Sequence, residues 1–248
     1  MTTNEDHWQT IRDVMAPINN KIFELLGDQV VTGPFAGMRV IPNPVWDDGN
    51  SGAKLIGSYE FELHKAVRKA ISRKPDAVIN VGCAEGFYAV GLAYRLSNAM
   101  VFAMDIDDGS LDQCEENAER NGRKVQTVTG RPGPQDLIRP GYQRTLYFLD
   151  CEGDESELLN KDDCPQLINS DIIVECHDFF YPKIKSHISS SLISRFSDTH
   201  DIERIVPQIP NPADYPFLRS LPLGFQLLAI TEKRPSDMAW LACWARRR

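Results

Sequence analysis

A glycine turn that joins a strand-like run to a helix-like run is the segment of this sequence best suited to hold a ligand. Residues 78–93 read VINVGCAEGFYAVGLA, with Gly82 and Gly86 in the turn. Small residues let the backbone approach a ligand closely, and the amide groups that open the following helix point at a nearby phosphate or carboxylate. The dinucleotide pattern G-x-G-x-x-G is not met, because Ala84 takes its second glycine position and the bulky Phe87 its third. NAD is therefore the weaker choice of cofactor.

Acidic residues and a histidine follow two of the expected buried strands. They are Asp150 and Glu152 after one strand, and Glu175, His177 and Asp178 after the next. Ligands of an open α/β sheet bind beyond the carboxyl ends of its strands, so these side chains are expected to face one another. In an extended chain, period-two alternation would turn Asp150 and Glu152 to one side, and Glu175 and His177 likewise. These residues are the catalytic candidates.

The glycine turn resembles the first motif of the class I S-adenosylmethionine-dependent methyltransferases, which reads acidic-x-G-x-G-x-G. Residues 80–86 read NVGCAEG, with Asn80 in place of the usual acid and Ala84 in place of the middle glycine. The resemblance implies that this loop holds S-adenosyl-L-methionine through Asn80, Gly82, Ala84, Glu85 and Gly86. It also implies that Asp105, at the tip of the next expected strand, binds both ribose hydroxyls, because a carboxylate accepts two hydrogen bonds. Asp107 is the alternative.

Three further segments resemble the FkbM-like branch of that family, whose members methylate hydroxyl groups of sugars and other natural products. They are GPFAGM at 33–38, GSYEFELH at 57–64 and LDCEGDE at 149–155, the last of which fits an Asp-x-Glu-Gly-x-Glu string at Asp150, Glu152, Gly153 and Glu155. This likeness implies O-methylation of a hydroxyl on a small polar metabolite. It also implies that Tyr59 and Glu60 touch the amino-acid end of the cofactor, with Asp150 beside the cofactor loop. A nitrogen acceptor and a cofactor-binding module without turnover stay open.

Methyl transfer from a sulfonium requires the protein mainly to position the acceptor and to remove its proton. His177 is the expected base, since an unperturbed imidazole has a pKa of about 6.5. Asp150 would orient it or bind the acceptor hydroxyl. In a second version Asp150 and Glu175, with His177 or Asp178, hold Mg²⁺ or another divalent ion, which would bind a vicinal diol and lower its hydroxyl pKa.

The first 75 residues are expected to form a cap on the ligand-binding core. Residues 1–27 are predicted to be an amphipathic helix, because apolar residues recur every three or four positions until Gly27. Residues 30–57 are rich in glycine, proline and asparagine and predict a loop or short hairpin. Residues 58–72 predict a second helix. We interpret residues 1–75 as the cap and residues 76–248 as the methyltransferase domain that the resemblance implies.

Short apolar runs alternate with helix-like segments after residue 75, which is typical of an α/β protein with a mostly parallel sheet. The runs are 77–81, 100–104, 125–129, 145–149 and 171–174, followed by 225–231 and 238–244. The last two are close together and predict an antiparallel C-terminal hairpin. The expected fold is Rossmann-like, with the seven-stranded sheet of the resembled family. A helix after the second strand is expected to begin with a capping box of Ser110 and Gln113.

Composition and charge narrow the partners of the 248-residue chain. With 27 basic and 35 acidic residues the net charge is -8, which disfavours nucleic acid and anionic membranes as partners. Residues 105–119 hold seven acids and no base, and residues 150–163 hold seven acids and one base. Both blocks begin at an expected strand tip, so the site should exclude anionic substrates. A small-molecule acceptor is expected, and a homodimer stays open.

The chain shows no sequence sign of a membrane or of an oxidising compartment. No window approaches the ~18 apolar residues of a membrane span, and the start, MTTNEDHWQT, lacks the layout of a secretory signal. The six cysteines are far apart and form no Cys-x-x-Cys pair, which is typical of reduced, buried thiols. We expect a cytoplasmic enzyme.

Overall fold

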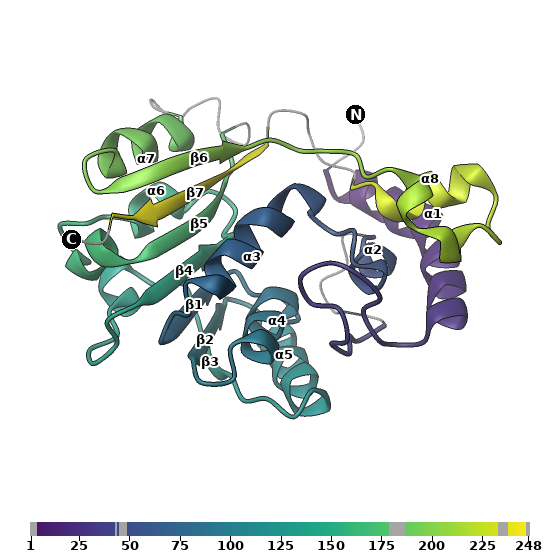
Figure 1. Cartoon of the computed structure of the whole chain (residues 1–248), viewed down its shortest axis with the longest axis horizontal. Coiled ribbons are helices and arrows are strands. Elements are labelled where there is room, and N and C mark those ends of the chain that lie inside the picture. The colour runs from purple at the N-terminus through teal and green to yellow at the C-terminus, as the bar shows by residue number, and fades with distance from the viewer. Residues whose placement is uncertain (1–3, 43, 45–48, 179–186, 233–237, 247–248) are drawn as a thin grey trace.

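Five neighbouring parallel strands make up most of the sheet in this computed structural model, which describes residues 4–42, 44, 49–178, 187–232 and 238–246. The strands are β1 (Ala77–Val81), β2 (Met100–Asp105), β3 (Gln126–Thr129), β4 (Thr145–Leu149) and β5 (Asp171–Cys176). The complete sheet has seven strands in the order β3-β2-β1-β4-β5-β7-β6 (Figure 1). The parallel register places the carboxyl ends of β1 and β4 side by side, with Val81 opposite Leu149.

The last two strands run antiparallel, as expected, but one of them is not the predicted segment. β7 (Ala239–Ala245) lies between β5 and β6 (His200–Ile205) and is antiparallel to both. The predicted partner 225–231 instead forms most of helix α8 (Leu223–Ile230). Its leucine-rich run carries no alternation that separates strand from helix. β6 escaped prediction because it is a half-exposed edge strand whose sequence, HDIERI, is mostly polar.

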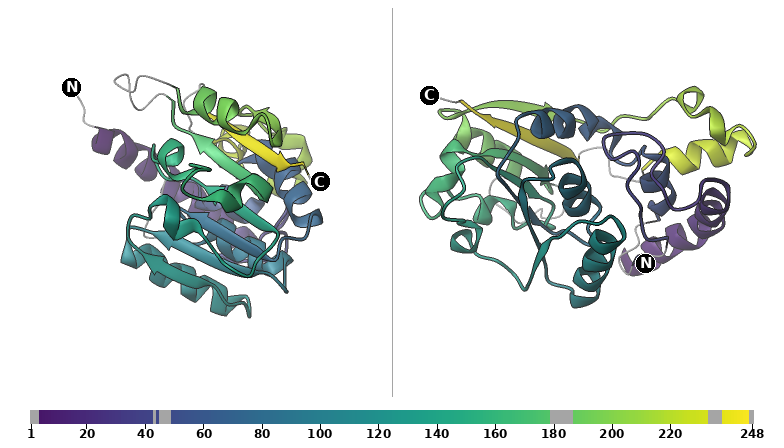
Figure 2. Two further views of the ribbon diagram at one scale, coloured as in Figure 1. Left: turned by 90° about the vertical axis from the view of Figure 1, so that its left-hand side faces the viewer. Right: turned by 60° about the horizontal axis from the view of Figure 1, so that its bottom comes forward.

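Helices cover both faces of the sheet, as Figure 2 shows. One face packs on α3 (His64–Ser72), α4 (Phe87–Arg95) and α5 (Asp108–Arg120). The other packs on α6 (Glu155–Leu158), α7 (Ile188–Phe196) and the 3-10 helices η2 (Pro134–Leu137) and η3 (Pro165–Asn169). Neighbouring residues such as Val78 and Ile79 belong to opposite cores, which is the alternation of a strand buried on both sides. The expected Rossmann-like α/β class is confirmed.

The N-terminal residues form the cap helices. α1 (Asn4–Leu26) ends at Gly27, whose φ of 77° is the left-handed conformation that glycine adopts readily. Arg39 in the predicted loop over 30–57 forms a bridge with Gln29 just before it, and the same stretch contains helix α2 (Ser51–Ile56), which was not predicted. The predicted helix over 58–72 begins later, as η1 (Phe61–Leu63) followed by α3.

The cap also includes residues from the C-terminal part of the chain. α8 packs against α1 and α2 beside the sheet (Figures 1 and 2), and the 3-10 helices η4 (Pro212–Asp214) and η5 (Pro216–Leu218) lie on the way to it. The division at residue 75 stays an interpretation. Within the described ranges no helix is both long and apolar enough to cross a membrane.

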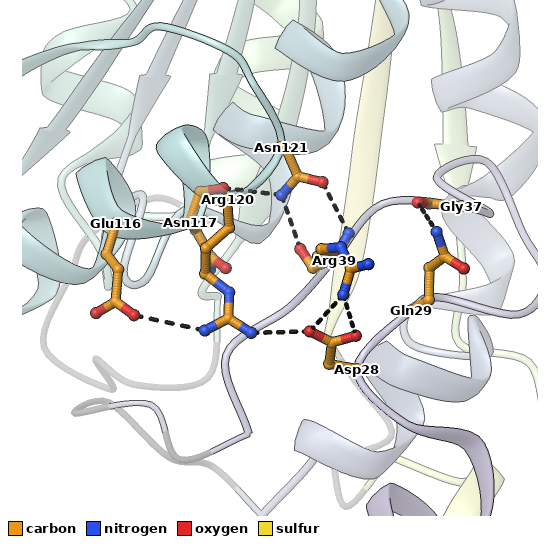
Figure 3. A network of polar contacts seen from close by, with 8 residues as sticks. All are labelled: Asp28, Gln29, Gly37, Arg39, Glu116, Asn117, Arg120 and Asn121. Carbon is orange, nitrogen blue, oxygen red and sulfur yellow. Dashed lines mark hydrogen bonds and ion pairs between the residues drawn. The ribbon is translucent and has the colours of Figure 1, made fainter.

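A polar network fastens the cap to α5 (Figure 3). The Arg39 guanidinium donates to Asp28 at 2.7 Å, and Arg120 of α5 donates to the same carboxylate at 2.9 Å. The Asn121 side chain accepts from the Arg39 amide at 2.8 Å and donates to the Arg39 carbonyl at 2.9 Å. The hairpin around Gln29 and Arg39 is therefore held against the helix that follows β2.

Candidate functional site

The glycine loop turns sharply where β1 ends, and two of its positions accept only glycine. Gly82 has a φ of 71°, and a Cβ there would lie 1.6 Å from the carbonyl oxygen of Asp150. Gly86 has a φ of 86°, and its Cβ would lie 2.4 Å from Sγ of Cys114. Ala84 takes the left-handed conformation at a φ of 46°, which costs a non-glycine residue about 1 kcal/mol. The loop thus lies directly against the end of β4.

Asp105 at the tip of β2 is locked onto the glycine loop. One carboxylate oxygen accepts from the Ala84 amide at 2.8 Å and the other from the Asp107 amide at 3.0 Å. Asp107 caps α5 instead, because its side chain accepts from the Ser110 amide at 2.7 Å. The predicted capping box of Ser110 and Gln113 is therefore wrong: the helix begins earlier, at Asp108, with an acid as its N-cap.

A cavity of about 580 Å³ opens beyond the carboxyl ends of β1, β2 and β4. This size is typical of a site for a cofactor or small molecule. The predicted cofactor residues that line it are Tyr59, Asn80, Gly82, Ala84, Glu85, Asp105 and Asp150. Gly86 and Glu60 are not among the described lining residues; the buried Glu60 carboxylate accepts from the hydroxyl of Tyr88, which does line the cavity.

Two buried oxygen atoms on the cavity wall have no hydrogen-bond partner among the described residues. They are Oδ1 of Asn80 and Oε2 of Glu85. The Asn80 amide nitrogen donates to the Phe148 carbonyl at 3.2 Å, and Oε1 of Glu85 accepts from Lys54 at 2.5 Å. Lys54 lies in α2. It was not among the candidate residues, because this stretch was predicted to be a loop or short hairpin. An ammonium group on a ligand would fit the two open acceptors.

The acidic residues after β4 and the histidine after β5 form one cluster. Nδ1 of His177 lies 2.7 Å from Glu155, while Nε2 lies 3.3 Å from Glu175, 3.5 Å from Glu152 and 3.6 Å from Asp150. Four carboxylates therefore surround one imidazole. Asp150 and Glu152 both lie near Nε2, but not through the strand alternation that was expected. The chain turns at Glu152, which takes the left-handed conformation at a φ of 56°.

The cluster is exposed to the cavity on one side only. Asp150 keeps 31% of its side chain accessible and lines the cavity, whereas His177 and Glu175 are 0% and 2% accessible and lie behind it. Asp178 does not join the cluster, because its carboxylate accepts from the amide and hydroxyl of Ser189 in α7. Of the five catalytic candidates, Asp150 and Glu152 line this cavity and can touch a ligand in it.

The carboxylates decide the charge state of His177. Burial by itself lowers the pKa of an imidazole, but hydrogen bonds to Glu155 and Glu175 and the charge of Asp150 outweigh it and raise the pKa of His177 to about 11. Burial and the Glu175 carboxylate raise the pKa of Asp150, and His177 opposes that rise. The sequence-based role of His177 as a base needs a neutral imidazole, whereas here it holds its proton at neutral pH.

Glu155 is a site residue that was not among the catalytic candidates from the sequence. Its side chain is fully buried and also accepts from the Gly153 amide at 3.1 Å. The signal that could have found it is its place as the last acid of the Asp-x-Glu-Gly-x-Glu string.

Asp150, Glu175 and His177 could also hold a metal ion. Each offers one ligand atom, and these atoms lie within 4.8 Å of one another. Carboxylate oxygens and an imidazole fit a divalent ion, and the hydrogen bond from Nδ1 to Glu155 is of the kind that orients a metal-binding histidine. The same cluster is also balanced by a protonated His177, so the metal stays a prediction.

Fold and site together define a class: a Rossmann-like α/β protein with a mixed seven-stranded sheet, a glycine loop after β1 and an acid at the tip of β2 beside a cofactor-sized cavity. This is the arrangement that the resemblance to class I methyltransferases implied. No protein-family model matches the chain.

The chain is similar to part of a release factor glutamine methyltransferase from Geobacter sulfurreducens. The two are 30% identical over 101 residues, which is 40% of this chain and 32% of the relative. The match therefore spans about a third of the relative's length.

Solved methyltransferase structures resemble the chain in fold. A precorrin-6y C5,15-methyltransferase from Geobacter metallireducens aligns with a TM-score of 0.49 at 11% identity, over 74% of this chain and 89% of that one. An rRNA methylase from Streptococcus thermophilus aligns with a TM-score of 0.46 at 11% identity, over 75% and 97% of the two chains.

Proposed function

We propose that this protein is an S-adenosylmethionine-dependent methyltransferase that methylates a hydroxyl group of a small polar metabolite. The observation that carries the proposal is one cavity lined by two chemically different groups of residues. One group is the glycine loop with Asp105 fixed to it, and the other is Asp150, backed by His177. The partial relative is a methyltransferase by name, which supports the reaction type.

The cofactor fits the first group, the glycine loop with Asp105. The Gly82–Gly86 loop would hold it against the ends of β1 and β4, and Asp105 would accept from the ribose hydroxyls. The open acceptors Asn80 Oδ1 and Glu85 Oε2 suit a cationic group. When bound, S-adenosyl-L-methionine supplies a methyl group already activated on a sulfonium.

Asp150 is the group that would meet the acceptor. It lines the cavity, and its raised pKa brings a carboxylate closer to the range in which a base works at neutral pH. His177, held protonated behind it, would position Asp150 and balance the charge of the cluster. Such acidic surroundings favour a neutral hydroxyl over an anionic acceptor.

The finer parts of the proposal come from the FkbM-like string at 150–155. It favours a sugar or another natural product as the acceptor. In the metal version, Asp150, Glu175 and His177 would hold a divalent ion that lowers the pKa of the acceptor hydroxyl. A nitrogen acceptor and a module without turnover are the alternatives. Exposed apolar residues of α8, such as Phe225 and Leu227, are compatible with a homodimer.

Calorimetry with S-adenosylhomocysteine tests the cofactor assignment. The wild-type protein is expected to bind it, and Asp105→Ala to bind it roughly tenfold more weakly or worse, because a charged hydrogen-bond acceptor is lost. Asp112→Ala is the matched control, since Asp112 is an exposed acid of α5 outside the cavity lining. If the wild-type protein bound neither S-adenosylhomocysteine nor S-adenosyl-L-methionine, the proposal would be wrong.

A further inference from the structure

A buried ion pair forms part of the cavity wall, and the methyl-transfer chemistry does not use it. Nζ of Lys54 lies 2.5 Å from Oε1 of Glu85, and the two side chains are only 8% and 6% exposed. Lys54 comes from α2 of the cap, Glu85 from the glycine loop, and both line the cavity. The pair therefore joins two separate segments at the surface that a ligand would touch.

The position of the Lys54 ammonium is set by aromatic rings as well as by Glu85. It lies 4.9 Å from the ring centre of Tyr59 and 5.9 Å from that of Phe87, and both rings line the same cavity. Buried ion pairs add little net stability, because removing two charges from water costs about as much as their attraction returns. Stability alone is thus a weak reason for a buried charge pair on this wall.

The wall next to the pair offers open acceptors. Oε2 of Glu85 and Oδ1 of Asn80 are buried and lack a hydrogen-bond partner within the described part of the chain. Both residues are held in place: Asn80 donates to the Phe148 carbonyl at 3.2 Å, and Asn117 donates to the Glu85 carbonyl at 2.9 Å. One cation and two open acceptors therefore stand side by side on one wall.

We propose that Lys54 and Glu85 recognise the zwitterionic amino-acid head of the cofactor. Lys54 binds the carboxylate of the head, and Glu85 Oε2 together with Asn80 Oδ1 binds its α-ammonium. An ammonium carries three donors, so Lys54 can hold a ligand carboxylate while it stays bonded to Glu85. A neutral charge pair meeting a neutral zwitterion buries no net charge. The inference rests on the proposed function and adds the residue that selects for a ligand carboxylate.

Calorimetry on the full-length protein with three ligands distinguishes the contribution of the ligand carboxylate from that of the ligand ammonium. S-adenosylhomocysteine carries both charged groups, S-adenosyl-3-thiopropylamine lacks the carboxylate, and 5′-methylthioadenosine lacks both. The wild-type protein is expected to bind S-adenosylhomocysteine roughly tenfold or more tightly than the amine, because the amine lacks the carboxylate that accepts charged hydrogen bonds from Lys54.

Lys54→Met assigns the carboxylate contact. It is expected to weaken S-adenosylhomocysteine binding roughly tenfold or more and to leave the binding of the amine and of 5′-methylthioadenosine within about threefold. The control is Arg120→Met, which removes another cap-to-core ion pair, with Asp28, outside the cavity. Its affinities for all three ligands should match the wild type. The double variant Lys54→Met/Glu85→Gln avoids an unpaired buried carboxylate and should bind all three ligands about equally.

Two results would overturn the inference while leaving the proposed function intact. One is equal binding of all three ligands by the wild-type protein, a measurement that needs no variant to fold. The other is an equal loss of all three affinities in Lys54→Met, which would show that Lys54 only fastens the cap. If the wild-type protein bound none of the three, the proposed function itself would fail.

Discussion

Oε1 of Glu155 lies 2.7 Å from Nδ1 of His177, and neither side chain has any accessible surface. The contact joins the turn after β4 to the end of β5. It also determines which ring nitrogen faces the cavity side: Nδ1 is held by Glu155, so Nε2 points to Glu175, Glu152 and Asp150. Glu155 is therefore a positioning residue for the cluster behind Asp150.

Glu155→Gln should lower the free energy of unfolding by about 3 kcal/mol at pH 7, because it removes one carboxylate from a buried charged pair. Denaturant titration measures this change. Glu157→Gln, an exposed acid of the same short helix, should change stability by less than about 0.5 kcal/mol. Equal stability of both variants would show that the Glu155 contact does not hold the cluster together.

Asp150→Asn should lower the rate of methyl transfer about a hundredfold, because an amide cannot accept the proton of the acceptor. Binding of S-adenosylhomocysteine should stay within about threefold. The assay follows radiolabelled methyl transfer from S-adenosyl-L-methionine to a panel of neutral sugars and polyols. Asp154→Asn is the control, since Asp154 lines the same cavity but pairs with Arg131. Full activity of Asp150→Asn would assign the proton to another group.

Treatment with a chelator should leave the rate unchanged if the protonated His177 balances the carboxylates of the cluster. The measurement is methyl transfer before and after chelation, followed by addition of Mg²⁺ or Mn²⁺. Loss of activity that either ion restores would favour the metal version with Asp150, Glu175 and His177 as ligands.

His64 should make the protein less stable in mild acid. Burial lowers the pKa of His64 to about 4, with Arg68 acting in the same direction and the Tyr59 carbonyl against it. Between pH 6.5 and pH 4 the His64 imidazole is protonated in the unfolded chain but still neutral in the folded one. The stability of the folded state is therefore undiminished by His64 above pH 6.5 and falls as the pH falls. The loss is at most about 3 kcal/mol.

Denaturant unfolding at pH 7 and pH 4.5 measures this effect. His64→Gln should lose roughly 2 kcal/mol less than the wild type between the two pH values. His187→Gln, at an exposed histidine, should keep the wild-type dependence. An unchanged pH dependence in His64→Gln would show that the imidazole does not stay neutral on folding.

Local patterns were enough to predict most of the sheet and the position of the site. The runs at 77–81 and 145–149 are β1 and β4 with the predicted bounds. Strands buried on both faces are continuous apolar runs, which can be recognised in the sequence. The sequence also placed the glycine turn after β1 and Asp105 at the tip of β2. Both follow from the rule that ligands of such sheets bind at the carboxyl ends of the strands.

Segments with ambiguous or polar patterns could not be assigned in this way. The apolar run at 225–231 fits a strand or a helix, and as α8 it packs against α1 and α2 with Ala229 and Ile230 buried. The edge strand β6 has too few apolar residues to be recognised, and only its pairing with β7 makes it a strand. In both cases the deciding interactions come from residues far away in the chain.

By itself, the sequence determined the α/β class, the glycine loop after β1 and the acids that follow β4 and β5, because each depends on neighbouring residues and on the regular direction of strands. Only the tertiary structure decided which of these side chains meet. Glu155 and His177 are 22 residues apart and Lys54 and Glu85 are 31 apart. Packing of the cap and of the turn after β4 brings these residues together. Buried charged groups require charged partners, and partners so far apart in the chain cannot be recognised from a local sequence pattern.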